Sequence, residues 1–364
     1  MEFVNIKYIT HNGQALFDED CNGVPSYEEA KDLKPVVIDD YFRIKEESEN
    51  IANYERYIKE EYLLIPVRRV PDKKEGGEGS FPSRILLEIT SRCNLNCVMC
   101  PRTVLEREQV HMPKELAIKC IDEIGHFGVE GLWLYNIGES FLHPDFKEIF
   151  GYCQNKNNLG SIWLSTNGQE ISEEIMDIVI NSNLAFLNYS LNAMNPESYS
   201  MISPNGSYEK LVINLEKLLE KKNRLGKLGI PPWIRVQMVD QPQVASEIDW
   251  FLQEYSKKCE MLSVNVLEAF NQNVNQNIGY ARQRTRDNKR HCNRIQRGDF
   301  FIFADGEVGF CDTDFNHKMS LGSVYKNTIK ELWDSDVYAR YKALESAGKL
   351  DELSMCRECL DYDL

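Results

Sequence analysis

Short apolar runs alternate with helical patterns along the central part of the chain. The runs cover residues 85–90, 132–137, 162–166, 186–191, 234–239 and 262–267. Between them lie segments such as YEKLVINLEKLLEKK, whose apolar positions recur at intervals of three and four residues. Strands that are joined by helical crossovers run parallel, and strands buried on both faces are nearly continuously apolar. We therefore predict an α/β fold in which six strand-helix repeats form a partial (β/α)6 TIM-like barrel.

The segments on either side of these repeats have different patterns. Residues 1–70 contain a helical stretch at 46–62 and short apolar runs, without a clear three-strand pattern, and the Gly- and Pro-rich stretch 71–82 is typical of a linker. After residue 271 a polar, basic stretch precedes FFIFADGEVGFC, which predicts a hairpin, and TIKELWDSDVYARYKAL, which predicts one helix. We predict an N-terminal region of unknown role at 1–80, a barrel at 81–275 and a C-terminal domain at 276–364.

Composition and charge narrow the class of protein. The 364 residues are 42% hydrophobic and carry a formal charge of −15, which argues against binding to nucleic acid or to an anionic membrane. No apolar run approaches the roughly 18 residues of a membrane span. The N-terminus lacks the basic and apolar regions of an export signal, so we expect a cytoplasmic protein.

The eleven cysteines are the main chemical signal, because the cytosol keeps thiols reduced and available as metal ligands. Seven of them fall into two groups, one at residues 93–100 and one at residues 292–359. The other four are scattered, and we expect them to be buried small apolar residues: Cys21, Cys120, Cys153 and Cys259.

Cys93, Cys97 and Cys100 form a C-x3-C-x2-C triplet directly after the first predicted barrel strand. Three thiolates on one loop hold three irons of a cubane cluster and leave the fourth iron open to a small molecule. A structural zinc site is the alternative, but it would need a fourth Cys or His, and none lies nearby in the sequence. The triplet also lies where a parallel barrel carries its catalytic loops.

At these residues the chain resembles the radical S-adenosylmethionine (SAM) superfamily, with Met99 as the apolar residue before the last cysteine. The resemblance covers residues 84–364. It implies a SAM-binding [4Fe-4S] cluster, SAM as cofactor and a flavodoxin- or ferredoxin-type reductant. It also implies the reaction, in which an electron from the cluster cleaves SAM to methionine and a 5′-deoxyadenosyl radical that abstracts hydrogen from a substrate.

Three other strand ends carry side chains that the resemblance assigns to SAM binding. Gly138 and Glu139 look like the family's Gly-Glu motif, in which a carboxylate pairs with the methionyl ammonium group. The other assigned residues have hydroxyl or amide groups that hydrogen-bond ribose or carboxylate oxygens: Ser165, Asn167, Ser190 and Asn192. Each of them alone is equally compatible with an ordinary turn or helix cap.

The second cysteine group supplies four thiolates, enough to close a cubane completely: Cys292, Cys311, Cys356 and Cys359. Zinc binds four cysteines equally well, so ligand count alone does not separate the two metals. The surrounding segments are similar to the SPASM/twitch extension of radical SAM enzymes. Four cysteines rather than seven imply the twitch form with one auxiliary [4Fe-4S] cluster, and such intervals are also found in aminocyclitol dehydrogenases of the family.

These features lead to three functional hypotheses. The first is oxidation of a small hydroxyl-bearing sugar, cyclitol or natural-product intermediate, with candidate bases and binding groups at Glu268, Asn271, Arg284 and Arg290. The second is modification of a ribosomally made peptide, with the N-terminal region binding a leader and Cys259 or Cys120 donating hydrogen for an epimerisation. The third is a zinc-stapled binding protein without enzymatic activity.

Overall fold

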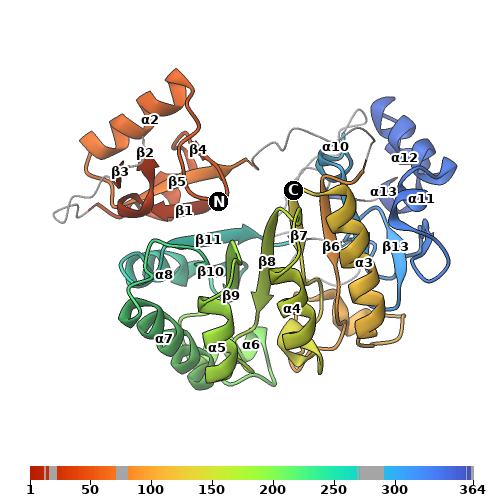
Figure 1. The fold of residues 1–364 in the computed structure, drawn as a ribbon. Coiled ribbons are helices and arrows are strands. Elements are labelled where there is room, and N and C mark those ends of the chain that lie inside the picture. The colour runs from red at the N-terminus through yellow and green to blue at the C-terminus, as the bar shows by residue number, and fades with distance from the viewer. Residues whose placement is uncertain are drawn as a thin grey trace. The chain divides into compact units, whose positions relative to one another are not determined.

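The computed structural model describes residues 1–11, 14–15, 23–70, 81–268, 270, 291–357 and 359–361. The chain divides into two compact units (Figure 1). The first unit contains residues 1–72, 166–202 and 206–266, and the second contains residues 73–165, 203–205 and 267–364. Candidate residues Cys21, Asn271, Arg284 and Arg290 lie outside the described residues.

Six strands of the first unit follow the order β9-β10-β11-β1-β5-β4. Strands β9, β10 and β11 are parallel, whereas β1 is antiparallel to both β11 and β5. The unit also holds the short antiparallel pair β2 and β3. The bounds are β1 Glu2–Asn5, β2 Thr10–His11, β3 Gln14–Ala15, β4 Val36–Ile38, β5 Leu64–Arg69, β9 Phe186–Ser190, β10 Trp233–Asp240 and β11 Met261–Val266.

Amphipathic helices accompany the strands of the first unit. In α7, Leu211, Leu215 and Leu218 are buried at spacings of four and three residues, and Ser207 caps the first turn by accepting a hydrogen bond from the amide of Lys210 at 3.1 Å. The bounds are η1 Ile6–Tyr8, α1 Tyr27–Lys31, α2 Ser48–Lys59, α5 Glu173–Ile180, α6 Pro196–Ile202, α7 Tyr208–Arg224, η4 Ala245–Glu247 and α8 Ile248–Tyr255.

The N-terminal region contains three neighbouring strands, which the sequence pattern did not predict. Strand β1 lies between β5 and β11, with Phe3 opposite Pro66 on one side and Leu262 on the other. The region therefore extends the sheet formed by β9, β10 and β11. The pattern gives no signal because β1 and β4 are only four and three residues long, too short to show an alternation.

Six strands of the second unit follow the order β14-β13-β12-β6-β7-β8. Strands β6, β7 and β8 are parallel, and β12 lies parallel to β6 on its other side. Strands β12 and β13 form the predicted hairpin, in which Gly306 supplies the positive φ of +82°. The bounds are β6 Arg84–Leu87, β7 Gly131–Trp133, β8 Ser161–Thr166, β12 Asp299–Ile302, β13 Glu307–Gly309 and β14 Gly322–Ser323.

The predicted single helix near the C-terminus is instead two helices. Helix α11 ends at Trp333, and Ser335 begins a new helix by accepting a hydrogen bond from the amide of Tyr338 at 3.3 Å. The helices of the unit are η2 Pro101–Val104, α3 Lys114–Phe127, η3 Ser140–Leu142, α4 Phe146–Gln154, α10 Asn293–Arg297, α11 Ile329–Trp333, α12 Asp336–Ser346, η6 Leu350–Glu352 and α13 Ser354–Arg357.

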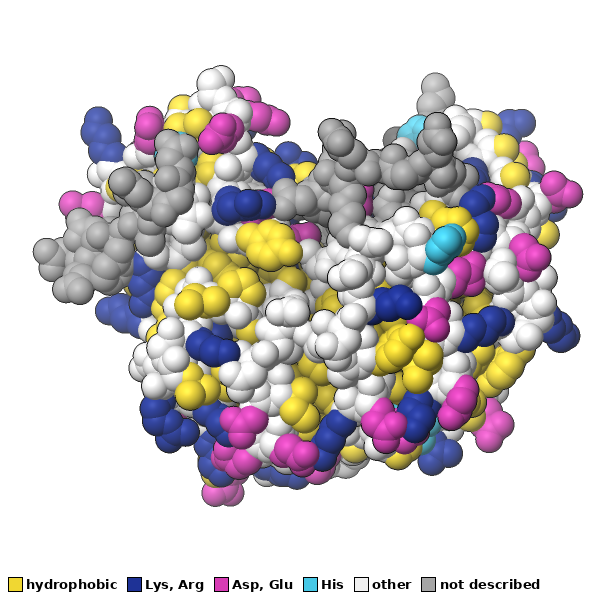
Figure 2. All heavy atoms as spheres, viewed as in Figure 1, with side chains coloured by type: hydrophobic (Ala, Val, Ile, Leu, Met, Phe, Trp, Pro, Cys, Tyr) yellow, Lys and Arg dark blue, Asp and Glu magenta, His cyan; other side chains and the backbone are white. Residues whose placement is uncertain are grey.

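The six strands of the predicted repeats are therefore present as β6 to β11, three in each unit, and the predicted α/β class is confirmed. The predicted domain boundaries near residues 80 and 275 adjoin segments outside the described residues and stay a prediction. Among the described residues, no helix has both the length and the apolar character needed to cross a membrane. Figure 2 shows basic and acidic side chains interspersed on the face in view.

Candidate metal centres

The first cysteine group lies on the loop that follows β6. Cys93, Cys97 and Cys100 are all half-buried. Burial raises the pKa of the Cys100 thiol to about 12, and the neighbouring Cys97 and Cys93 raise it further. Burial also raises the pKa of Cys97, again with a contribution from Cys93. The three thiols are thus close enough to influence one another, and a metal that binds them must displace their protons.

A short segment between α6 and α7 holds this loop. The Asn205 side chain accepts a hydrogen bond from the amide of Asn96 at 2.8 Å and donates one to the carbonyl of Asn94 at 2.8 Å. The hydroxyl of Ser203 lies 3.0 Å from the sulfur of Cys97. The two Asn205 hydrogen bonds fix the backbone between the first two cysteines. Sequence reasoning missed both residues because they lie more than 100 positions from the loop.

Gly138 lies against the same cysteine loop. A Cβ atom at Gly138 would lie 2.0 Å from the carbonyl oxygen of Thr90 and 3.0 Å from that of Arg92. The next amide, of Glu139, donates a hydrogen bond to the Arg92 carbonyl at 2.9 Å. The absence of a side chain at Gly138 is therefore required for this close approach, whatever else the residue contacts. The Glu139 side chain is buried and caps η3, 3.3 Å from the amide of Phe141.

The remaining predicted SAM contacts lie at strand ends of the two units. Ser165, in the second unit, is half-buried at the end of β8. In the first unit, the Asn167 side chain accepts a hydrogen bond from the amide of Gln169 at 3.0 Å, so it stabilises a turn. Ser190 ends β9 opposite Gln237, and Asn192 follows with a φ of +60°. Met99 is half-buried beside Cys100.

Several buried polar atoms at the strand ends have no hydrogen-bond partner within the described structure. They are the side-chain oxygen of Asn192, the side-chain nitrogen of Asn136 and both amide atoms of Gln241, which is fully buried directly after β10. Buried polar groups are normally paired, so unpaired ones at strand ends are suited to a polar ligand. This fits SAM. Sequence reasoning missed Gln241, for which the position directly after a strand is the one available signal.

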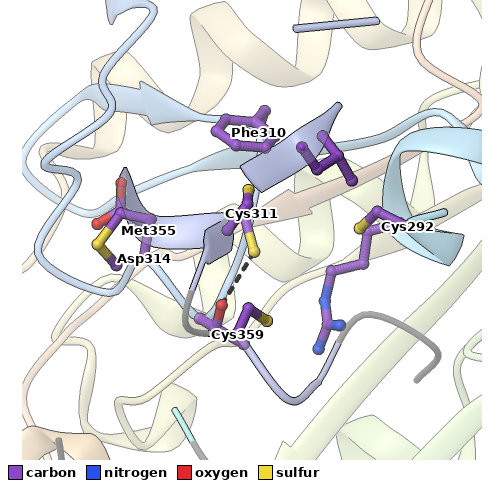
Figure 3. A pocket seen from close by; sticks show the side chains of 10 residues that line it. Cys292, Phe310, Cys311, Asp314, Met355 and Cys359 are labelled. Atoms are coloured by element: carbon purple, nitrogen blue, oxygen red, sulfur yellow. Dashed lines mark hydrogen bonds between the residues drawn. The ribbon is translucent and has the colours of Figure 1, made fainter. Parts of the chain in front are cut away.

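The second cysteine group encloses a hollow in the second unit. Figure 3 shows Cys292, Cys311 and Cys359 pointing into the same hollow from three segments of the chain. Its walls contain all four predicted thiols together with Arg294, Phe310, Thr313, Asp314, Leu350 and Met355. Four cysteines around a hollow fit a cluster, because each thiolate of a cubane binds a different iron. Among the described residues, no three Cys, His, Asp or Glu side chains surround a single ion position.

The thiols of this hollow are adjacent, with Cys292 buried and Cys311, Cys356 and Cys359 half-buried. Burial raises the pKa of Cys311 well above its usual value, and the nearby Asp312, Cys292 and Cys359 raise it further. The Cys311 sulfur lies 3.1 Å from the hydroxyl of Thr313, and the amide of Asp361 donates a hydrogen bond to the Cys359 sulfur at 3.3 Å. Hydrogen bonds of this kind stabilise thiolate ligands.

Three of the scattered cysteines are structural. Cys120, Cys153 and Cys259 are all buried among apolar residues. Burial raises the pKa of Cys120 and of Cys153 to about 12. The Cys259 thiol donates to the carbonyl of Tyr255 at 3.3 Å. The expectation that these cysteines pack as small apolar residues is confirmed, while Cys21 lies outside the described residues.

Comparison with family models places both cysteine groups in known kinds of domain. Residues 87–233 match the model of the Radical SAM superfamily. Residues 292–360 match the model of an iron-sulfur cluster-binding domain, SPASM. The first match contains Cys93, Cys97 and Cys100, and the second contains Cys292, Cys311, Cys356 and Cys359.

The individual relatives are similar to this chain over only part of its length. The tungsten-containing aldehyde ferredoxin oxidoreductase cofactor-modifying protein of Pyrococcus furiosus is 32% identical over 93 residues, 25% of this chain and 26% of that protein. The mycofactocin maturase MftC of Mycolicibacterium smegmatis is 30% identical over 156 residues, 42% of this chain and 38% of that protein. The chain thus spans less than half the length of these relatives.

A solved structure shares the fold. SuiB of Streptococcus suis, bound to S-adenosylmethionine, has a TM-score of 0.54 and 13% identity, over 83% of this chain and 75% of that one. At this identity the likeness concerns the fold alone. The partial TIM-like barrel with a C-terminal cluster-binding domain is confirmed.

Proposed function

Because the chain belongs to the radical SAM superfamily and its cofactors are SAM and iron-sulfur clusters, we propose that it oxidises a hydroxyl group of a small sugar, cyclitol or natural-product intermediate. The observation that carries the proposal is the hollow with four thiols. An auxiliary cluster with four protein ligands has no iron left for substrate, so its natural role is to accept an electron. Oxidation of a substrate hydroxyl group requires such an electron acceptor.

We assign the SAM cluster to Cys93, Cys97 and Cys100 and the auxiliary cluster to Cys292, Cys311, Cys356 and Cys359. When bound, SAM and its cluster supply a 5′-deoxyadenosyl radical after one-electron reduction by a flavodoxin- or ferredoxin-type protein, and the auxiliary cluster supplies an electron acceptor. Oxidation of the hydroxyl group would remove a hydrogen atom from the substrate carbon, a proton from the hydroxyl and one further electron, so it would need a radical, a base and an electron acceptor. The product is a ketone or aldehyde.

Of the named candidate bases, Glu268 lies within the described residues. It follows β11, its side chain is 32% exposed, and its carboxylate lies 3.8 Å from the guanidinium of Arg294. A carboxylate at the end of a barrel strand is suited to accept a hydroxyl proton. We propose Glu268 as the base.

Peptide modification is the competing hypothesis, and SuiB, whose structure is also solved with the precursor peptide SuiA, gives it weight. A leader peptide that binds by strand addition needs an open strand edge. In the N-terminal region β4 is the last strand in the sheet order, yet its outer edge is occupied. The Asn50 side chain accepts from the amide of Val37 at 2.6 Å and donates to its carbonyl at 2.8 Å, and Ile38 bridges to Ile44. This favours the small-molecule substrate.

The test is deuterium transfer. The reconstituted enzyme would be incubated with SAM, reductant and either a panel of sugars and cyclitols that carry deuterium on their carbinol carbons or a set of deuterium-labelled peptides. We expect deuterium in 5′-deoxyadenosine and a matching carbonyl product with at least one panel member. Deuterium transfer only from labelled peptides would overturn the proposal in favour of peptide modification.

A further inference from the structure

Arg294 occupies a special position in the wall of the auxiliary hollow. It lies two residues after Cys292, in α10, and its side chain is only 4% exposed. Its Nε donates to the carboxylate of Asp312 at 2.5 Å, and its Nη1 donates to the carbonyl of Asp361 at 2.5 Å. Asp312 directly follows Cys311, and Asp361 lies two residues after Cys359. One guanidinium therefore joins the segments that carry three of the four thiols.

Near the hollow, acidic side chains outnumber the single positive charge of Arg294. Asp312 and Asp314 are both near the hollow, and Glu268 lies 3.8 Å from Arg294. Four thiolates add further negative charge when a cluster is bound. Arg294 is the cation that lines the hollow among the described residues. In a buried site each fixed charge has a large effect on the energy of adding an electron.

We propose that Arg294 is a positioning residue that sets the reduction potential of the auxiliary cluster and so makes that cluster an electron acceptor. The inference rests on the proposed function, since it explains how the cluster takes the electron that the substrate loses. Arg294 raises the potential, and Asp312 lowers it. The two substitutions should therefore shift the potential in opposite directions.

The experiment is a redox titration of the complete, reconstituted enzyme without substrate, followed by electron paramagnetic resonance. The signal that SAM does not alter reports the auxiliary cluster. At a fixed potential, we expect Arg294→Gln to lower the reduced-to-oxidised ratio by about tenfold, which is about 59 mV for one electron. Asp312→Asn should raise the ratio. Arg294→Lys should shift the ratio less than Arg294→Gln. The positive charge stays, although lysine cannot reproduce the hydrogen bonds of the guanidinium to both Asp312 and Asp361.

Arg297→Gln is the matched control, because Arg297 ends the same helix but pairs with Asp299 at 2.7 Å and does not line the hollow. Its potential should equal that of the wild type. If Arg294→Gln fails to retain iron, Asp312→Asn still tests whether removing a charge shifts the reduction potential in the expected direction. Unchanged potentials in both variants with full iron content, or shifts in the same direction, would overturn the inference. Deuterium transfer tests the substrate separately, so either proposal can fail alone.

Discussion

Glu88 and Arg107 form a buried ion pair at 2.8 Å, with side chains 0% and 3% exposed. Glu88 follows β6, immediately before the first cysteine loop, and Arg107 lies on the segment that follows this loop. Glu88 also accepts a hydrogen bond from the amide of Ala304 at 2.9 Å, and Arg107 donates to the carbonyl of Phe315 at 2.7 Å. Within the second unit, the pair thus connects the first cysteine loop to the hairpin that leads to Cys311.

Replacing Arg107 with Ala should destabilise the protein strongly. It leaves Glu88 buried without its partner, and loss of one member of a buried pair costs about 3 kcal/mol or more. Urea unfolding under anaerobic conditions measures the change in the free energy of unfolding. Arg56→Ala is the control, because Arg56 and Glu60 form an exposed pair whose loss should have little effect on stability. Equal effects of the two substitutions would contradict a structural role for the buried pair.

A methyl group at Gly138 should displace the first cysteine loop. The new Cβ of Gly138→Ala would lie 2.0 Å from the Thr90 carbonyl, so the backbone before Cys93 must move. Iron analysis should show the loss of about four of about eight irons per chain. Gly151→Ala, within α4, is the control because its Cβ would meet nothing within 4 Å. It should keep all iron and gain up to about 1 kcal/mol of stability. Full iron content in Gly138→Ala would show that the loop tolerates the shift.

Stability should depend on pH through His317. The Asp305 carboxylate lies 2.9 Å from the imidazole and, by this hydrogen bond, raises the pKa of His317 above 6.5. A raised pKa adds stability that is fully present below pH 6.5 and is lost as the pH rises through the folded-state pKa. His317→Gln should therefore cost about 1.5 kcal/mol near pH 6 and much less near pH 9.

Urea unfolding at both pH values measures the difference. His126→Gln serves as control, because His126 is exposed on α3, and it should show no pH-dependent loss. If the cost of His317→Gln were the same at both pH values, the charged pair would not contribute to stability.

The strand-helix repeats were predictable because each depends on a local pattern. The runs at 186–191 and 234–239 became β9 and β10 with shifts of one residue at the ends. Local patterns do not report pairing between distant segments. The parallel pair of β12 and β6 joins Phe301 to Leu86, more than 200 residues apart, and no periodicity indicates it. Likewise, the split between α11 and α12 depends on a single capping serine within a continuous helical pattern.

The cysteine ligands of both metal centres were predictable from the sequence, but the residues around them were not. The number and spacing of the cysteines indicate both groups, and the position after a strand adds to the signal for the first group. The residues that hold the two groups were missed for physical reasons. Asn205 and Ser203 reach the first loop from a distant turn. Arg294 follows a polar, basic stretch that is typical of an exposed connection, yet its contacts with two aspartates bury it.

The two cysteine groups should be separable by substitution. If Cys93, Cys97 and Cys100 hold the SAM cluster, Cys93→Ala should abolish formation of 5′-deoxyadenosine, because two thiolates do not present an open iron to SAM. The four-thiol hollow is built from other segments, so its cluster and about four irons should remain. Cys311→Ala should do the reverse: SAM cleavage continues, while substrate oxidation is lost with the electron acceptor.

Liquid chromatography of 5′-deoxyadenosine together with iron analysis distinguishes these outcomes. Cys153→Ala is the matched control, because Cys153 is buried in α4 and belongs to neither group. It should lower stability modestly and leave both iron content and SAM cleavage unchanged. If Cys93→Ala still produced 5′-deoxyadenosine, the assignment of the open cluster to this loop would be wrong. If Cys311→Ala left substrate oxidation intact, the electron would have to leave by another route than the hollow, and the proposed role of the auxiliary cluster would fail while the SAM chemistry stood.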